Sequence, residues 1–313
     1  MKLISNFLKT AFTVDFRLAV KMIINKIVYR NREKYIHANN LAKFDYIKSR
    51  FSYLLKKYNK PQSSDAKNTG PIWVFWWQGQ DNMPEIVKLC YNQLLQSSTA
   101  AHPVVFLHEK NLNDYIVIPE YIINKVKSGI ISFTHFSDIV RLSLLAEHGG
   151  LWIDSTVYVH NIIDEEIFSK RYFSAKAPFN PKYISRCEYT GFLIGAAPQS
   201  RWILFARDLL YEHWKHSQIL LDYVFIDFIL ITAFDELPHL KEELTPCIRY
   251  TPHIHKIEEM RNLKCNEADF NKYLEECQFY KLSYKLEFKQ LTPDNDLTWY
   301  GRLVKNKRHT ENG

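Results

Sequence analysis

The sequence lacks a long apolar run. A helix that spans a bilayer needs about 20 consecutive apolar residues, and no such run occurs among the 313 residues. In residues 1–28 the apolar positions are interrupted every few residues by Lys9, Asp15, Arg17, Lys21 and Lys26. This segment also shows no signal-peptide pattern. The sequence therefore predicts a cytoplasmic protein that is not integral to a membrane.

Cysteine is scarce and unpatterned. The five cysteines are scattered, with no CxxC and no Cys/His cluster at zinc-finger spacing: Cys90, Cys187, Cys247, Cys265 and Cys277. This argues against a disulfide framework or a structural zinc site and favours a reducing compartment. No HExxH motif is present either, and for His253 and His255 a structural role is favoured over metal binding.

Acidic residues are few at the start of the chain. Residues 1–60 hold 14 Lys or Arg against three acids, so they carry +11 of a net +7 and leave the remainder near −4. Residues 1–58 are predicted to form two or three basic amphipathic helices. An anionic membrane surface would attract them, or they pack on the rest of the protein with their lysines in solvent. Nucleic acid would fit the charge alone, but no helix-turn-helix, RNA-recognition or zinc pattern is present.

The remaining chain predicts an α/β fold. Residues 59–70 are rich in polar and turn residues and are predicted to be a linker. In residues 71–313, short apolar runs then alternate with helical stretches, which predicts a sandwich with a mainly parallel sheet. The expected strands are residues 72–76, 104–107 and 151–153, and the expected helices are residues 85–95, 120–127 and 136–148. Ligands of such sheets bind at the carboxyl ends of the strands.

The segment from Phe136 to Val159 is the most informative. In the predicted helix, Asp138 and Arg141 are three residues apart on the face opposite an apolar stripe. Two glycines end the helix, and Asp154 follows the next strand. Alone, the first two could be a surface ion pair. With Asp154 at the strand exit, they predict a site where a carboxylate holds a cation and arginine clamps a phosphate or sugar.

The string from Ser137 to Asp154 resembles the signature of DXD-type glycosyltransferases. This group includes bacterial capsular polysaccharide synthesis proteins, yeast Golgi mannosyltransferases and large clostridial glucosylating toxins, and the capsular branch is the nearest match. The resemblance implies a Rossmann-like GT-A fold and a retaining hexosyltransferase that uses Mn²⁺ or Mg²⁺. It implies a nucleotide-sugar donor, namely a UDP-sugar, and a polyprenyl-diphosphate-linked oligosaccharide acceptor at the inner face of the cytoplasmic membrane.

The same resemblance assigns roles to individual residues. The implied catalytic residues are Asp138, Arg141 and Asp154. The implied donor-binding residues are Trp77, Gln78, Gly79, Asp138, Arg141, Gly150 and Trp299. Residues 281–285 and 298–301 resemble the family's closing motifs, which fold over the donor diphosphate in relatives. Asp222 and Asp227, acids in an apolar stretch predicted to be helical, are candidates for the acceptor side or for support of the site, with capping or salt bridging as the alternative.

The sequence departs from the family at Thr156. The string Asp154-Ser155-Thr156 lacks the second carboxylate of a DXD motif. Asp154 and Thr156 would then hold the cation more weakly, because threonine offers a neutral oxygen. The missing acid also leaves open a catalytically inactive, glycosyltransferase-like scaffold.

Overall fold

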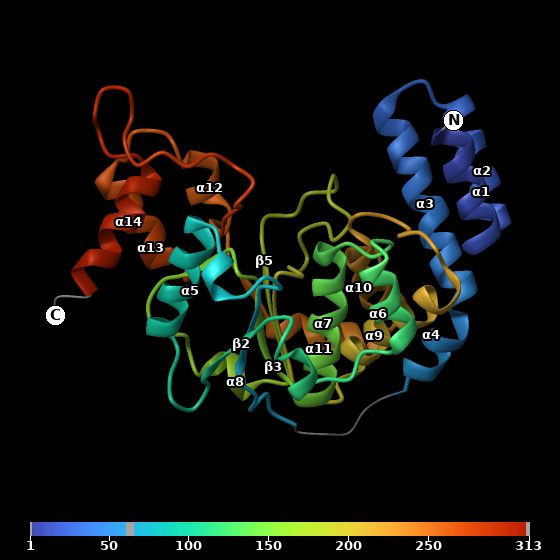
Figure 1. Cartoon of the computed structure of the whole chain (residues 1–313), viewed down its shortest axis with the longest axis horizontal. Helices are drawn as coiled ribbons and strands as arrows, with labels where there is room; N and C mark the ends of the chain where they lie inside the picture. Colours follow the sequence, from blue (N-terminus) through green and yellow to red (C-terminus); the bar gives the residue numbers. More distant parts are fainter. Residues whose placement is uncertain (1, 61–65, 311–313) are drawn as a thin grey trace.

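The computed structural model describes residues 2–60 and 66–310 (Figure 1). Residues 61–65 of the predicted linker lie outside this range. The described strands include a central sheet of six, in the order β2-β1-β3-β6-β5-β7. They are β1 (Ile72–Phe75), β2 (Val104–Leu107), β3 (Gly150–Ile153), β5 (Tyr172–Lys176), β6 (Leu193–Ala196) and β7 (Ile248–Tyr250).

The sheet is mostly parallel, as the alternating sequence pattern predicts. Strand β1 pairs in parallel with β2 and β3, and β5 pairs in parallel with β7. Strand β6 is the exception, antiparallel to both β3 and β5. A separate antiparallel pair joins β4 (Val157–Val159) to β8 (Phe279–Lys281). The predicted α/β class is confirmed.

Helices cover both faces of the sheet, because neighbouring strand residues point to opposite sides. Trp73 and Phe75 of β1 enter one apolar core, whereas Ile72 and Val74 enter the other. Figure 1 shows the sheet between two groups of helices. The first core includes α6 (Glu120–Lys127), α7 (Phe133–His148), α9 (Arg201–His216), α10 (Phe225–Glu236) and α11 (Pro238–Leu244). The second includes α5 (Glu85–Ser97), α8 (Glu166–Ser169), α12 (Lys256–Met260), α13 (Glu267–Glu276) and α14 (Trp299–Thr310).

The helix before β3 begins earlier than its apolar stripe predicts. It starts at Phe133, because the Ser132 hydroxyl accepts a hydrogen bond from the His135 backbone N–H at 3.3 Å and caps the first turn. It ends at His148 and is followed by the cap Gly149, whose φ of +67° suits glycine. The other strands and helices expected from Ile72 to Ile153 are present within two residues of their predicted ends.

The amino-terminal segment is helical, as expected, but its described residues form four helices where two or three are predicted. Its helices are α1 (Lys2–Thr13), α2 (Phe16–Val28), α3 (Arg32–Arg50) and α4 (Ser52–Tyr58). Tyr46, Ile47 and Phe51 from the latter half of this segment join the first core, and so does Leu18 of α2. Helices α1 and α2 lie at one end of the molecule in Figure 1. None of the described helices is long and apolar enough to cross a bilayer.

Candidate active site

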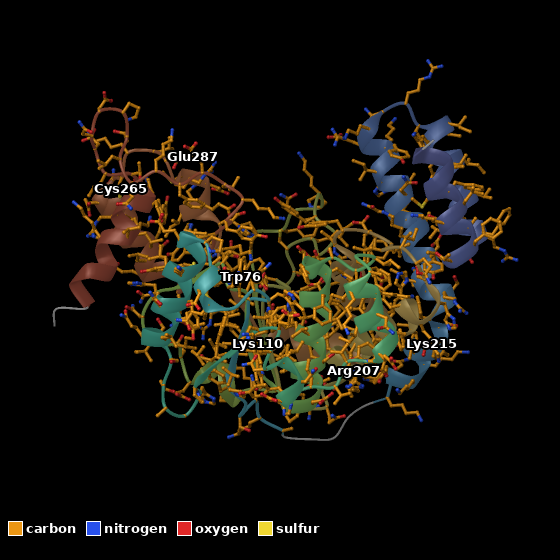
Figure 2. All side chains as sticks on the ribbon, viewed as in Figure 1. Trp76, Lys110, Arg207, Lys215, Cys265 and Glu287 are labelled. Carbon is orange, nitrogen blue, oxygen red and sulfur yellow. The ribbon has the colours of Figure 1, made fainter. Side chains whose placement is uncertain are left out.

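A cavity of about 600 Å³ opens at the edge where β1 and β3 end and β6 begins. This volume falls within the range of clefts that hold small ligands. Aromatic side chains after β1 line part of it, and Figure 2 shows one of them, Trp76, near the middle of the molecule. Polar lining comes from α7, the turn after β3, the region around the start of α10 and the chain after β8. The carboxyl ends of two parallel strands thus meet the cavity, as expected for this class of sheet.

Asp138 and Arg141 line the cavity from α7 and also pair with each other. Arg141 Nη1 lies 3.2 Å from Asp138 Oδ1, and their side chains are only 6% and 12% exposed. They are therefore an ion pair, but one buried in a cavity wall rather than on an open surface. Arg141 Nε is buried and has no hydrogen-bond partner among the described residues.

Asp154 follows β3 and is held by three hydrogen-bond donors. Its Oδ1 accepts from Arg141 Nη2 and from Trp152 Nε1, each at 2.8 Å. Its Oδ2 accepts from Lys281 Nζ at 2.8 Å. Burial would raise the pKa of Asp154, but Lys281 and Arg141 outweigh it and bring that pKa below its ordinary value. Asp154 is therefore ionised at neutral pH.

Lys281 reaches Asp154 from a strand 127 residues further along the chain. It ends β8, where its Cα lies opposite that of Val157 on β4. The next backbone N–H, of Leu282, donates to the Thr156 carbonyl oxygen at 2.9 Å. Lys281 Nζ also donates to Thr156 Oγ1 at 2.8 Å. The ammonium is thus held between Asp154 and Thr156.

The Asp138 carboxylate is oriented by a contact with His135. Trp214 Nε1 donates to His135 Nε2 at 2.9 Å, and His135 Nδ1 lies 3.2 Å from Asp138 Oδ2. An indole N–H can only donate, so Nε2 accepts and the proton of the imidazole sits on Nδ1, facing the carboxylate. This fixed tautomer holds the Asp138 carboxylate toward Arg141.

Asp227 lies on α10 and lines the cavity near the same residues. A Cβ at Gly191 would lie 3.4 Å from Arg141 Nη1 and 3.7 Å from Asp227 Oδ1, so Gly191 lies beside both groups. Burial, followed by the charge of Asp138, raises the pKa of Asp227 to about 7. Near neutral pH this carboxyl can therefore hold or take up a proton.

The structure brings most of the predicted site together. Asp138, Arg141, Asp154, Thr156 and Asp227 all line the cavity, and Trp77 and Gln78 line it from the chain after β1. The Trp77 ring stacks on Phe133 of α7, with centroids 5.2 Å apart and planes 24° apart. An aromatic wall of this kind suits the flat face of a base or sugar.

Three predicted donor-binding residues do not line the cavity: Gly79, Gly150 and Trp299. Gly150 is required by packing, because its φ is +98° and a Cβ would lie 2.3 Å from the Pro71 carbonyl oxygen. Trp299 is fully buried in the second core, with its ring 5.6 Å from that of Phe270. Burial speaks against the donor contacts predicted for Gly150 and Trp299, and the contact predicted for Gly79 stays a prediction.

Asp222 also lies apart from the cavity lining. It sits in the turn before α10 rather than in the predicted helix, and its Oδ1 accepts from the Val224 backbone N–H at 3.1 Å. Its Oδ2 pairs with Lys43 of α3. The capping and salt-bridging alternative therefore describes Asp222, which fastens the amino-terminal helices to the sheet domain.

The residues around Asp154 are a poor fit to a Mg²⁺ or Mn²⁺ site. Mg²⁺ demands a near-octahedral set of oxygens, part of which water and phosphate can supply. Here the protein provides one carboxylate and one hydroxyl, and both already accept hydrogen bonds from Lys281. Within residues 2–60 and 66–310, no group of three or more His, Cys, Asp or Glu could hold a metal ion. Metal binding by Asp154 and Thr156 stays a prediction, and the hydrogen bonds that both side chains accept from Lys281 argue against it.

Sequence reasoning gave no individual role to Lys281 or His135. Lys281 lies in the segment whose resemblance to a closing motif places it over the diphosphate, so a signal for its position was present. No comparable signal marked His135, because a histidine in the first turn of a helix is unremarkable until its partners are known.

Three comparisons relate this chain to known proteins. The family described as capsular polysaccharide synthesis protein matches residues 22–302. The O-glycosyltransferase braB of Annulohypoxylon truncatum is 29% identical over 146 residues, which cover 44% of this chain and 32% of that protein. The alignment thus spans about a third of that relative's length. Among solved structures, PaToxG glycosyltransferase matches with a TM-score of 0.38 and 12% identity, covering 76% of this chain and 95% of that one.

Proposed function

This chain belongs to the capsular polysaccharide synthesis protein family, and on that premise we propose that it is a glycosyltransferase. Its donor is a nucleotide sugar, namely a UDP-sugar, and its acceptor is a lipid-linked precursor of a capsular or surface polysaccharide. The observation that supports this most is the cavity network of Asp138, Arg141, Asp154 and Lys281. It places two carboxylates and two cations beside an aromatic wall.

Each part of this network meets a need of glycosyl transfer. Negative charge develops on the departing diphosphate, and cations fixed in a partly buried site stabilise it. Carboxylates such as Asp138 accept hydrogen bonds from sugar hydroxyls and so orient the donor. Asp227, with a pKa raised to about 7, can take the proton of an acceptor hydroxyl. The product is expected to keep the anomeric configuration of the donor, as the resemblance to retaining enzymes implies.

The proposal is tested by a melting-temperature screen of the full-length protein against nucleotide sugars, with Mn²⁺ and with a chelator. A donor that binds the folded state raises its melting temperature. Hydrolysis of the donor that binds, followed by NMR, then reports turnover and the anomeric configuration of the released sugar. A chain that binds no nucleotide sugar would contradict the proposal.

A donor that binds but is neither hydrolysed nor transferred would support the inactive scaffold. Thr156 in place of a second acid is the observation that favours this alternative.

The lipid-linked acceptor requires the protein to work at a membrane surface, and α1 and α2 suit that task. Three of their apolar side chains are strongly exposed: Phe12 at 83%, Phe16 at 63% and Ile27 at 76%. The same helices expose the basic residues Lys9, Arg17, Lys21 and Lys26. Insertion of apolar side chains combined with attraction to anionic lipid holds peripheral helices on the cytoplasmic leaflet. No nucleic-acid partner is proposed.

Co-sedimentation with phosphatidylglycerol vesicles tests this docking. Binding should fall as salt rises, because screening weakens the attraction. Replacing Phe12 and Phe16 by serine should release the protein, whereas Val117→Ser, an equally exposed apolar position at 83% in the sheet domain, should not. Full-length protein that ignores these vesicles at low salt would instead favour helices that serve only in packing.

A further inference from the structure

The ammonium of Lys281 occupies the place where the sequence predicts a metal ion. Its Nζ lies 2.8 Å from Asp154 Oδ2 and 2.8 Å from Thr156 Oγ1. These are the two residues predicted to hold the cation. Because threonine is neutral, Asp154 supplies the carboxylate among the described hydrogen-bond partners of Lys281 Nζ. A divalent cation would first have to displace Lys281 from Asp154.

The position of Lys281 is fixed by its backbone. Its N–H donates to the Ile254 carbonyl oxygen at 2.7 Å, and the strand pairing with β4 places it beside Thr156. Its Nζ also lies 4.9 Å from the centroid of the Phe192 ring. A free lysine side chain loses much rotamer entropy when it binds a ligand. In this structure that loss has already occurred on folding, so the charge is preorganised.

Hydrogen-bond counting leaves part of this cation for a ligand. An ammonium has three N–H donors, and the described acceptors of Lys281 Nζ are Asp154 and Thr156. Lys281 itself lines the cavity with 21% of its side chain exposed. A phosphate oxygen in the cavity can therefore take the third N–H.

We infer that Lys281 is a catalytic cation that neutralises the donor diphosphate, so that the protein binds and uses its donor without a divalent metal. The inference rests on the proposed glycosyltransferase function. In the reaction, the bond from the anomeric carbon to the diphosphate oxygen breaks, and both electrons go to the diphosphate. The acceptor hydroxyl oxygen bonds to the anomeric carbon, and its proton passes to the Asp227 carboxylate, as in the proposed function. Lys281 keeps its own proton and donates a hydrogen bond to the leaving diphosphate.

Calorimetry of UDP binding to the full-length protein tests this, with GDP in parallel and with UMP as the ligand that lacks the second phosphate. Wild-type affinity for the diphosphate should agree within about twofold between chelator and Mn²⁺. Lys281→Met should weaken diphosphate binding by about 10-fold or more, as expected for loss of a hydrogen bond to a charged group, and change UMP binding far less. Lys281→Arg should keep much of the affinity, because it keeps the charge.

Lys289→Met is the matched control. Lys289 is exposed, pairs with Glu287 at 3.5 Å and does not line the cavity, so its loss should leave binding unchanged.

The outcomes separate this inference from the proposed function. Diphosphate binding that disappears in chelator and returns with Mn²⁺ overturns the inference and leaves the glycosyltransferase proposal standing. The inference is also overturned if Lys281→Met binds UDP as tightly as wild type in chelator. If no nucleoside diphosphate binds in either condition, the proposed function fails and the inference fails with it. The chelator comparison needs only wild-type protein, so it holds even where a variant does not fold.

Discussion

Asp154 is held from two sides that differ in how far apart their residues lie in the sequence. On one side, Arg141 and Asp138 come from the helix just before β3, within 16 residues of Asp154. On the other, Lys281 comes from β8, 127 residues away. The near side can be deduced from helix spacing and a strand end. The far side depends on a strand pairing that no local pattern specifies, and it supplies the charge that changes the expected chemistry.

The two sides also differ in burial. Arg141 is 6% exposed and touches two carboxylates, whereas Lys281 is 21% exposed and touches one. We expect Arg141→Met to cost about 3–5 kcal/mol of unfolding free energy, because it leaves buried carboxylates short of a partner. Lys281→Met should cost about 1 kcal/mol or less, since Asp154 keeps Arg141 and Trp152. Urea denaturation measures both, and equal losses would contradict the contrast.

Removing the negative charge of Asp154, with which both Arg141 and Lys281 pair, should have the largest effect on turnover. Asp154→Asn is expected to lower turnover about 100-fold or more, roughly 3 kcal/mol, with the fold intact. Donor hydrolysis is the measurement, and the control is Asp235→Asn, which breaks an ion pair with Arg186 at the surface. A variant that keeps more than about a tenth of wild-type turnover would show that the site does not depend on this carboxylate.

We expect that a metal site at Asp154 and residue 156 can be created only if Lys281 is also replaced. In Thr156→Asp alone, the new carboxylate should pair with Lys281, and Mn²⁺ affinity should change little. In Thr156→Asp combined with Lys281→Met, two carboxylates face an empty position, and Mn²⁺ should bind about 10-fold or more tightly than to wild type. Calorimetry with Mn²⁺ alone checks this. A single variant that binds Mn²⁺ as well as the double would mean that Lys281 does not compete with a cation.

The smallest expected effect is on the pH dependence of stability, and it concerns Asp227 of α10. Its pKa is raised to about 7 in the folded protein, against an ordinary value of 3.8. The proton it keeps stabilises the folded state fully below about pH 4, and this contribution is lost as the pH rises through about 7. Wild type should therefore lose more stability between pH 6 and 8 than Asp227→Asn does. Parallel pH profiles of melting temperature for the two proteins would contradict the raised pKa.

The fold was largely predictable because its strands and helices are locally consistent. Residues 72–75 and 150–153 are continuous apolar runs, as expected for strands buried on both faces. The α7 pair Asp138 and Arg141 followed from a three-residue spacing. These features depend on neighbours within one or two turns, which a single sequence displays.

The rest of the site depends on contacts between distant segments. Nothing local indicated that β8 would pair with β4 and bring Lys281 to Asp154. The same holds for Asn68, in the predicted linker, whose side chain exchanges two hydrogen bonds with the Gly150 backbone. The prediction for Trp299 was wrong because the sequence around an aromatic residue does not show whether its side chain faces a ligand or the core. Trp299 is buried in the core.

The late position of β8 also matters while the protein is being made. Synthesis runs from the amino terminus and domains fold as they emerge, so α7 and β3 leave the ribosome well before Lys281 does. Until then Asp154 lacks one of its two cationic partners, and the proposed diphosphate site lacks one of its charges. A nascent chain can thus assemble most of its sheet, yet it would acquire its ability to consume donor only after β8 has emerged.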